Sequence, residues 1–213
     1  MTTEPSPEPV PEPVPAHGPA VPTADGRSRR DQILATAAEL FAARGFHGVS
    51  VADLGAACGI SGPALYKHFV SKDAVLAEML VSISEELLGV GRDRVADAPD
   101  PGAALAALVD WHVDFALRHR PLIVVQDRDW QSLPAEARER VRTLQREYVD
   151  LWAAQLRLVH GDLDPDRARA MAHAAFGLIN STPHSGLLPD GPMHGLLCEM
   201  ALGALGLPDG TAS

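Results

Sequence analysis

Residues 50–72 predict two short helices separated by a glycine turn, and this pattern restricts the fold more than any other part of the chain. Apolar residues recur at helical spacing through residues 51–58, and Gly59 interrupts them. Ser61 and Pro63 signal a second helix, because a serine hydroxyl accepts hydrogen bonds from the free amides of a first turn and proline needs no such bond there. Two helices joined by a tight glycine turn are typical of helix-turn-helix units, so DNA binding is the leading hypothesis.

The charge of the chain is distributed in a way that supports this hypothesis. The formal net charge of the 213 residues is −10. Residues 27–72 nevertheless carry six basic and three acidic side chains, whereas residues 1–26 carry four acidic side chains and no basic one. The other 141 residues carry 12 basic and 21 acidic side chains. A small cationic module on an acidic body is expected to direct DNA to that module alone.

Helical periodicity runs through the chain outside its ends. Ser28 is expected to cap a first helix that Gly45 closes, and Ser50 to cap the next one. Behind the helix-turn-helix unit, helices are predicted at residues 72–94, 103–119, 122–130, 134–160, 165–179 and 193–206. No segment of useful length alternates with the period of a strand, although residues 122–125 are β-prone in isolation. The predicted fold class is all-α.

The same pattern divides the chain into four predicted regions. The proline-spaced run PEPVPEPVP makes residues 1–26 a disordered tail, interpreted as a solubilising segment or as a proline-rich docking ligand. Residues 27–73 are expected to form a DNA-binding domain, residues 74–208 a ligand-binding and dimerisation domain, and residues 209–213 a second disordered tail. Two distant cysteines, no secretory signal and no membrane-length apolar run favour a cytoplasmic location.

The run GISGPALYKHFVSKDAVL, with two helices before it and about six after it, resembles the TetR family of bacterial transcriptional regulators. The resemblance is specific over residues 29–76, where LYKHF followed by Lys72 is similar to the recognition-helix signature of that family. The C-terminal two thirds resemble the family in helix number alone. The resemblance implies a fold of about nine helices, in which three N-terminal helices bind DNA and a larger C-terminal domain binds a ligand and dimerises.

The resemblance also implies roles for individual residues. A homodimer is expected to place two recognition helices in successive major grooves of palindromic, double-stranded operator DNA, about 34 Å apart. Phosphate contacts are assigned to Ser50, Tyr66, His68 and Lys72, and positions near the base edges to Gly62, Pro63, Ala64 and Lys67. Arg29 is expected, from its position in the sequence alone, to lie in a flexible arm on the DNA backbone. Lys67 is the candidate for a specific guanine contact. Tyr66 and His68 have an alternative interpretation as packing residues, and the arginines before residue 31 as a solvated linker.

The ligand domain is expected to hold a small, largely apolar effector that releases the DNA. Its predicted pocket residues are Trp111, His112, Phe115, Trp130, Trp152, His173, Phe176 and Asn180. Aromatic residues at helical spacing are also typical of a core, which is the alternative for each of them. Arg118, Arg120 and Arg128 favour an anionic effector such as an acyl-CoA or another lipid-like metabolite, although Asp127 and Asp129 neutralise part of their charge.

Small and apolar residues on the last two predicted helices are expected to form the dimer interface, with an intramolecular core as the alternative. These residues are Ala168, Ala172, Ala175, Leu197, Ala201 and Ala204. Close approach of two helix pairs needs small side chains of this kind. A charge at Ala175 or Leu197 is therefore expected to produce a monomer.

The sequence contains no constellation typical of an enzyme. A nucleophile with its base, paired carboxylates and a phosphate-binding glycine loop are all missing at recognisable spacing. His112 and His119 share a helix face, but two histidines without a cysteine or carboxylate at ligand spacing predict no metal ion. We therefore expect a DNA-binding transcriptional regulator, by family default a repressor, without catalytic residue, metal or cofactor. The alternative is a helical partner-binding protein with a non-functional DNA module.

Overall fold

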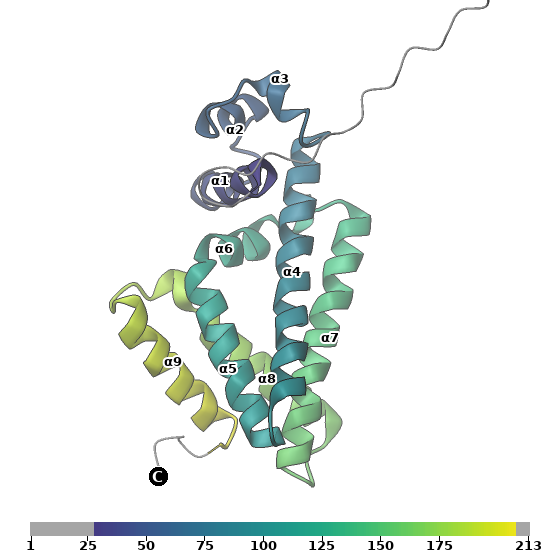
Figure 1. The fold of residues 1–213 in the computed structure, drawn as a ribbon, viewed down its shortest axis with the longest axis vertical. Coiled ribbons are helices and arrows are strands. Elements are labelled where there is room, and N and C mark those ends of the chain that lie inside the picture. Colours follow the sequence, from purple (N-terminus) through teal and green to yellow (C-terminus); the bar gives the residue numbers. More distant parts are fainter. Residues whose placement is uncertain (1–27, 208–213) are drawn as a thin grey trace, which may run out of the picture.

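The computed structural model describes residues 28–207, and the regular secondary structure of this part of the chain consists of helices without any strand, as predicted (Figure 1). The described helices are α1 (Arg29–Arg44), α2 (Val51–Ala57), α3 (Gly62–Leu65), α4 (Lys72–Asp97), α5 (Pro101–Arg118), α6 (Arg120–Asp129), α7 (Ala135–Val159), α8 (Pro165–Ile179) and α9 (Asp190–Ala204), with short 3₁₀ turns η1 (Trp130–Ser132) and η2 (Thr182–His184). The tails predicted at residues 1–26 and 209–213 lie outside the described residues. None of the described helices combines the length and the hydropathy needed to cross a membrane.

Helices α1, α2 and α3 form a group at one end of the molecule (Figure 1). Each begins after a serine whose hydroxyl accepts a hydrogen bond from a backbone amide of the first turn, and these serines are Ser28, Ser50 and Ser61. Gly45 and Gly59 take positive φ angles of 77° and 66° where α1 and α2 end, a conformation that side chains disfavour. The predicted caps and turn glycines are confirmed.

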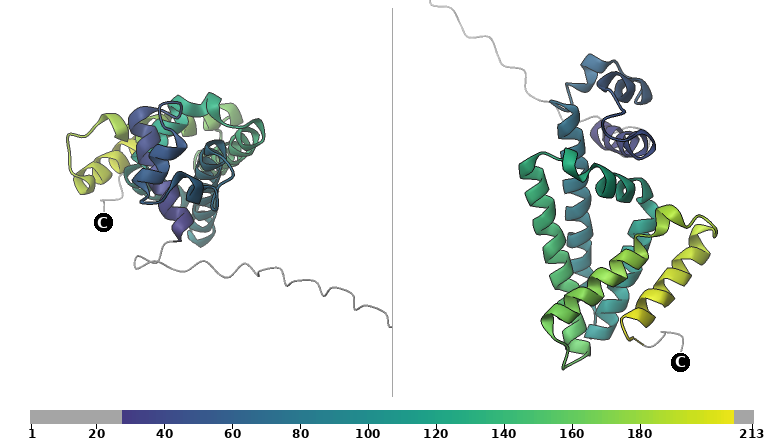
Figure 2. Two further views of the ribbon diagram at one scale, coloured as in Figure 1. Left: turned by 90° about the horizontal axis from the view of Figure 1, so that it is seen from above. Right: turned by 180° about the vertical axis from the view of Figure 1, so that it is seen from behind.

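The other helices form a bundle around one apolar core. Helix α4 runs from the N-terminal group to the far end of the molecule, with α7 packed along it (Figures 1 and 2). Helix α5 packs against α4, α7 and α9, and α8 packs against α7 and α9. Leu108, Trp152 and Leu156 are fully buried in the core that these helices share. Helix α6 crosses the upper end of the bundle and packs against α1.

A second hydrophobic cluster joins the N-terminal helices to the bundle. It contains Phe41 from α1, Leu65 from α3 and Leu76 from α4, together with Val125 from α6 and Val141 from α7. The predicted division between residues 73 and 74 falls near the start of α4, which runs across it without a break. The ranges 27–73 and 74–208 therefore stay a prediction, and a displacement of α4 or α6 must disturb the packing under α1.

Four helices extend beyond their predicted ends. Helices α5 and α6 each begin two residues earlier than predicted, at Pro101 and Arg120. Helix α4 continues to Asp97 and stops at Ala98, whose extended conformation is the one that the following Pro99 favours. Helix α9 begins at Asp190, so the prediction of a loop up to Pro192 is wrong there. Proline is tolerated in a first turn because its missing amide hydrogen is not needed. The β-prone residues 122–125 lie inside α6, where packing decides the conformation.

The residues predicted for the dimer interface lie mostly inside one chain. Ala168, Ala172, Ala175, Leu197 and Ala201 are each at most 4% exposed and belong to the main core. Ala204 is exposed. The interface prediction is therefore wrong at five of its six positions, because α8 and α9 turn their small residues towards α7 and α5.

Candidate nucleic-acid interface and ligand cavity

Helices α2 and α3 pack closely because Gly55 has no side chain. A Cβ atom at Gly55 would lie 2.9 Å from the carbonyl oxygen of Ile60 and 3.0 Å from the amide nitrogen of Gly62, closer than real contacts allow. The amide of Ile60 instead donates a 2.9 Å hydrogen bond to the carbonyl of Gly55. Gly55 is absent from the predicted site, although a glycine inside a short helical pattern signals such a close approach.

The turn that follows α3 holds an exposed tyrosine and lysine on a buried base, because α3 itself ends at Leu65. Leu65 and Phe69 are 2% and 3% exposed and anchor this turn. Tyr66 is 54% exposed. The other predicted contact residues of this segment are either exposed, Pro63 and Lys67, or half-buried, Gly62, Ala64 and His68. The segment is therefore a small polar surface on a rigid support.

Ser50 lies exposed at the start of α2, where its polar groups bind within the helix. Its hydroxyl accepts a 3.1 Å bond from the amide of Asp53, and its own amide donates a 2.8 Å bond to the Asp53 carboxylate. The hydrogen bonds from Ser50 lower the pKa of that carboxyl group. The immediate role of Ser50 is to begin α2 in one fixed direction.

The structure turns the ammonium group of Lys72 inward. Its Nζ atom donates 2.8 Å hydrogen bonds to the carbonyl oxygens of Phe46 and Val49 and lies 4.2 Å from the centre of the Phe46 ring. These carbonyls belong to the connection between α1 and α2. The prediction that Lys72 faces a phosphate is wrong for this conformation, because its donors hold α4 to that connection.

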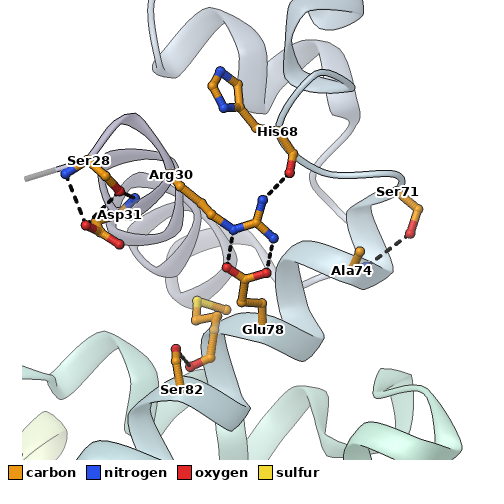
Figure 3. A network of polar contacts seen from close by, with 9 residues as sticks. Ser28, Arg30, Asp31, His68, Ser71, Ala74, Glu78 and Ser82 are labelled. Carbon is orange, nitrogen blue, oxygen red and sulfur yellow. Dashed lines mark hydrogen bonds and ion pairs between the residues drawn. The ribbon is translucent and has the colours of Figure 1, made fainter. Parts of the chain in front are cut away.

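Two N-terminal arginines also bind within the module. Arg29 donates a 2.6 Å hydrogen bond to the carbonyl of Cys58 at the end of α2. Arg30 binds the carboxylate of Glu78 and the carbonyl of His68, so that it ties α1 to the segment between α3 and α4 (Figure 3). The prediction of Arg29 in a flexible arm is wrong, because both residues belong to α1.

A cavity of about 250 Å³ lies among α4, α5, α6, α7 and α8. Its apolar lining is Ile83, Leu87, Phe115, Leu122, Ile123, Leu144, Val149 and Phe176, and its polar lining is Ser84, His112, Gln126, Asp127, Gln145, Tyr148, His173 and Asn180. Five predicted pocket residues are therefore brought together. The cavity is lined by polar and apolar residues in similar number, so it is less apolar than predicted from the sequence.

Three predicted pocket residues do not line this cavity. Trp111 donates a 3.1 Å hydrogen bond to the carbonyl of Leu87 and packs against Phe115. Trp152 is fully buried behind the lining. Trp130 packs against the cluster under α1, outside the cavity. The core interpretation, which the sequence leaves open, fits Trp111 and Trp152, whereas Trp130 is partly buried.

The cavity contains buried polar atoms without a hydrogen-bond partner among the described residues. These atoms include Nδ1 of His112 and the hydroxyl of Tyr148. Nε2 of His112 lies 3.2 Å from Oδ1 of Asn180, and its ring stacks on Phe176 with the centres 4.8 Å apart. Burial raises the pKa of Tyr148 well above its ordinary value, which keeps the phenol protonated. The site thus offers a donor at Tyr148 and, when Asn180 accepts from Nε2, an acceptor at His112.

The predicted arginine cluster does not exist. Arg118 binds Asp114 on its own helix, and Arg120 binds Asp190 on α9. Arg128 donates to the carbonyls of Phe41 and Ala42 at the end of α1, the latter at 3.0 Å. Since no arginine or lysine is among the residues that line the cavity, the argument for an anionic effector from these three residues is wrong.

Comparisons with known proteins decide the family. The chain is 33% identical over 139 residues to the HTH-type transcriptional repressor KstR2 of Rhodococcus jostii, an alignment that covers 65% of this chain and 68% of that protein. Residues 33–79 match the model for bacterial regulatory proteins of the tetR family, and residues 98–185 match a tetracyclin repressor-like C-terminal domain. The chain belongs to the TetR family. It is therefore a transcription regulator with a DNA-binding helix-turn-helix, in a family whose members are not enzymes.

Solved structures agree with this assignment. A TetR-family regulator from Bordetella parapertussis matches with a TM-score of 0.73 and 26% identity, over 81% of this chain and 93% of that one. AibR, solved with isovaleryl coenzyme A and operator DNA, matches with a TM-score of 0.64 and 22% identity, over 81% and 97% of the two chains. The regulator shares with both the three-helix N-terminal group and the helical body.

Stability of the regulator is expected to fall in mild acid because His112 is buried. Burial lowers the pKa of His112 to about 4, against an opposing hydrogen bond with Asn180. The unfolded chain, with an ordinary histidine pKa near 6.5, takes up this proton first, so stability is lost as pH falls from about 6.5 towards 4. Between pH 7 and pH 5 we expect a loss of roughly 2 kcal/mol in the free energy of unfolding, measured by urea denaturation.

The His112→Phe variant tests the assignment of this acid sensitivity. Phenylalanine keeps a ring against Phe176 and cannot take up a proton, so the difference between pH 7 and pH 5 should shrink by about the amount assigned to His112. The exposed His184 provides the control, since His184→Gln should leave the difference unchanged. An equal loss in wild type and His112→Phe would assign the acid sensitivity to other groups.

Proposed function

We propose that this regulator is a homodimeric repressor that binds a palindromic operator and releases it when a small ligand occupies the cavity. The repressor KstR2 is its relative, and AibR combines an operator and a small-molecule thioester on the same fold. One observation carries the proposal: α6 lines the cavity with Leu122, Ile123, Gln126 and Asp127, and its next residue, Arg128, binds the end of α1. A ligand that displaces α6 therefore acts on the helix-turn-helix unit.

The cavity favours a neutral ligand with an apolar part and a carbonyl or hydroxyl group. Tyr148 provides a donor and His112 an acceptor for that group, while Phe115 and Phe176 provide apolar surface. Asp127 in the lining disfavours an anion. A volume of about 250 Å³ accepts an acyl chain or a molecule of similar size, so the coenzyme portion of any acyl-CoA must lie outside the cavity.

Dimerisation is proposed to use the outward faces of α8 and α9 in place of the buried residues predicted from the sequence. Leu196 and Met200 are 40% and 49% exposed on α9, one turn apart. Leu187, before α9, is 94% exposed. Exposed small residues lie on the same two helices, Ala174 and Gly177 on α8 and Gly203 and Ala204 on α9. Apolar side chains beside small ones allow two helix pairs to pack closely around a twofold axis.

DNA contacts are proposed for the exposed surface around α3. Tyr66 and His68 bind phosphates there, Ser50 binds one at the start of α2, and Lys67 donates to a guanine. Gly62, Pro63 and Ala64 approach the base edges without long side chains, which makes DNA shape important for recognition. Arg29 and Lys72 support this surface from within, through their bonds to main-chain carbonyls.

Lys67→Ala and Tyr66→Phe are expected to weaken operator binding in different ways. Lys67→Ala should lose about 1–3 kcal/mol on the operator and relax the preference at one base pair, because a base contact disappears. Tyr66→Phe should weaken binding about equally on all sequences, because a phosphate contact carries no sequence information. Fluorescence anisotropy with the operator and single-base variants at two salt concentrations distinguishes these outcomes.

The matched control for these variants is Arg94→Ala, which removes an exposed cation near the far end of α4. It should bind the operator as the wild type does. If all variants match the wild type, the residue roles are wrong. If wild-type protein binds no duplex at all, the alternative of a partner-binding helical protein with a non-functional DNA module gains support.

A further inference from the structure

Three metal-ligating side chains meet between α5 and α9, outside the cavity. Asp110 comes from α5, and His194 and Cys198 lie one turn apart on α9. The Cys198 sulfur lies 3.7 Å from Nδ1 of His194, and the other ring nitrogen lies 3.4 Å from a carboxylate oxygen of Asp110. One ligand atom from each residue lies within 4.8 Å of the others.

One of these distances is close to that in a tetrahedral zinc site. With Zn–S near 2.3 Å and Zn–N near 2.0 Å, tetrahedral angles put the sulfur and nitrogen ligands about 3.5 Å apart. The distance between the Cys198 sulfur and Nδ1 of His194 has this value within about 0.2 Å. Asp110, whose side chain is 55% exposed, is free to turn its carboxylate towards the shared position.

We propose that Asp110, His194 and Cys198 bind one zinc ion that fastens α9 to α5, with water as the fourth ligand. Thiolate, imidazole and carboxylate are the ligand types that zinc takes in proteins, and a thiolate disfavours magnesium and calcium. Three protein ligands and one open position suit the half-exposed location at the edge of the bundle.

The state of the thiol disagrees with a nucleophile. Burial raises the pKa of Cys198 to about 11, and the negative charge of Asp110 adds to the effect. A cysteine, histidine and aspartate in contact also resemble a nucleophile with its base, but a nucleophilic cysteine needs a lowered pKa. Zinc replaces the thiol proton, so binding releases one proton to solution and strengthens as pH rises.

A zinc ion at this location is expected to stabilise the packing of α9 on α5. Asp110 directly precedes Trp111 and His112, and His112 lines the cavity. Helix α9 carries the exposed Leu196 and Met200 on another face. An ion between the two helices stabilises their packing by binding the folded chain and not the unfolded one. Zinc is therefore expected to raise the melting temperature of the full-length protein.

Cobalt substitution tests the site directly. The metal-free full-length protein should bind one Co²⁺, with the intense near-ultraviolet absorption of a thiolate bound to cobalt and the visible bands of a tetrahedral ion. Competition with a chelating dye then gives the zinc affinity. Cys198→Ser should abolish the near-ultraviolet band, and His194→Gln and Asp110→Asn should each weaken zinc by at least about tenfold, because even groups outside the ligand shell contribute that much.

Matched controls separate the proposed site from other metal binding. Cys58→Ser removes the other thiol, and Asp114→Asn removes the carboxylate one turn after Asp110; both should keep the cobalt spectrum. Far-ultraviolet circular dichroism establishes that each variant folds. Cobalt bound without a thiolate band, or with a band that persists in Cys198→Ser, would overturn the proposal. So would a melting temperature that zinc raises equally in wild type and in folded Cys198→Ser.

Discussion

The Met200→Glu variant is expected to be a folded monomer whose operator affinity is lower than that of the wild type by about a hundredfold or more. Met200 is 49% exposed on α9, so a glutamate there meets water in the free chain and the fold is kept. In the proposed dimer the same position faces the partner, where a carboxylate loses its hydration. Two linked recognition units bind more tightly than one by a factor of about 10² to 10⁴, and a monomer loses that factor.

Light scattering measures whether Met200→Glu is a monomer, and titration with operator DNA measures its affinity. The matched control is Leu158→Glu, which places the same charge on a 65% exposed apolar residue of α7 and should leave the dimer intact. Ala175→Glu gives the opposite contrast: Ala175 is 1% exposed, so a charge there should unfold the chain rather than dissociate it. A dimeric Met200→Glu protein would remove α9 from the proposed interface.

The contrast between Met200 and Ala175 shows what the sequence could predict about the helices and what it could not. Helix ends depend on neighbouring residues, so Ser28, Ser50 and Ser61 could be recognised as caps from local chemistry alone. The inward face of α8 or α9 is harder to predict, because small residues occupy several faces of both helices. Ala175 is buried and Gly177 is exposed, because the neighbouring helices cover one face of α8 and leave the other free.

The charged residues of the candidate site show a second limit. Tyr66 and Lys67 could be selected from the sequence because a buried Leu65 and Phe69 fix which side of the turn after α3 is exposed. The contacts of Lys72 and Arg128 could not be predicted, because a sequence identifies a cation but not the carbonyl oxygens to which it donates hydrogen bonds. Both bind main-chain oxygens from distant segments, which only the assembled fold brings near.

Arg128→Ala is expected to loosen the end of α1 in the absence of any ligand. The guanidinium of Arg128 binds the carbonyls of Phe41 and Ala42 and contacts the buried carboxylate of Asp129. Hydrogen bonds from a charged donor contribute about 1.5–3 kcal/mol each, and partial exposure of Arg128 reduces that value. A loss of about 1.5 kcal/mol should raise the exchange rates of the amides that depend on this contact about tenfold.

Hydrogen exchange followed by mass spectrometry resolves this change along the chain. Faster exchange is expected in peptides that cover the last turn of α1 and residues 45–49, with α7 and α8 unchanged. Arg92→Ala is the matched control, because Arg92 is an exposed arginine whose ion pair with Glu147 lies in the bundle. It should leave α1 at the wild-type rate.

Hydrogen exchange in Arg128→Ala also shows which contacts transmit a structural change from the cavity to α3. The end of α1 is held by Arg128 from α6, and the connection after it is held by Lys72 from α4. If Arg128→Ala loosens α1, then α6 is a mechanical link, and a ligand that moves Leu122 and Ile123 changes the position of α2 and α3 through it. If α1 stays protected, the Arg128 contact is not required. The response must then pass through the apolar packing of α6 on α1, where Val125 and Phe41 share one cluster, or through α4, which joins the cavity residue Ile83 to the helix-turn-helix unit within one helix.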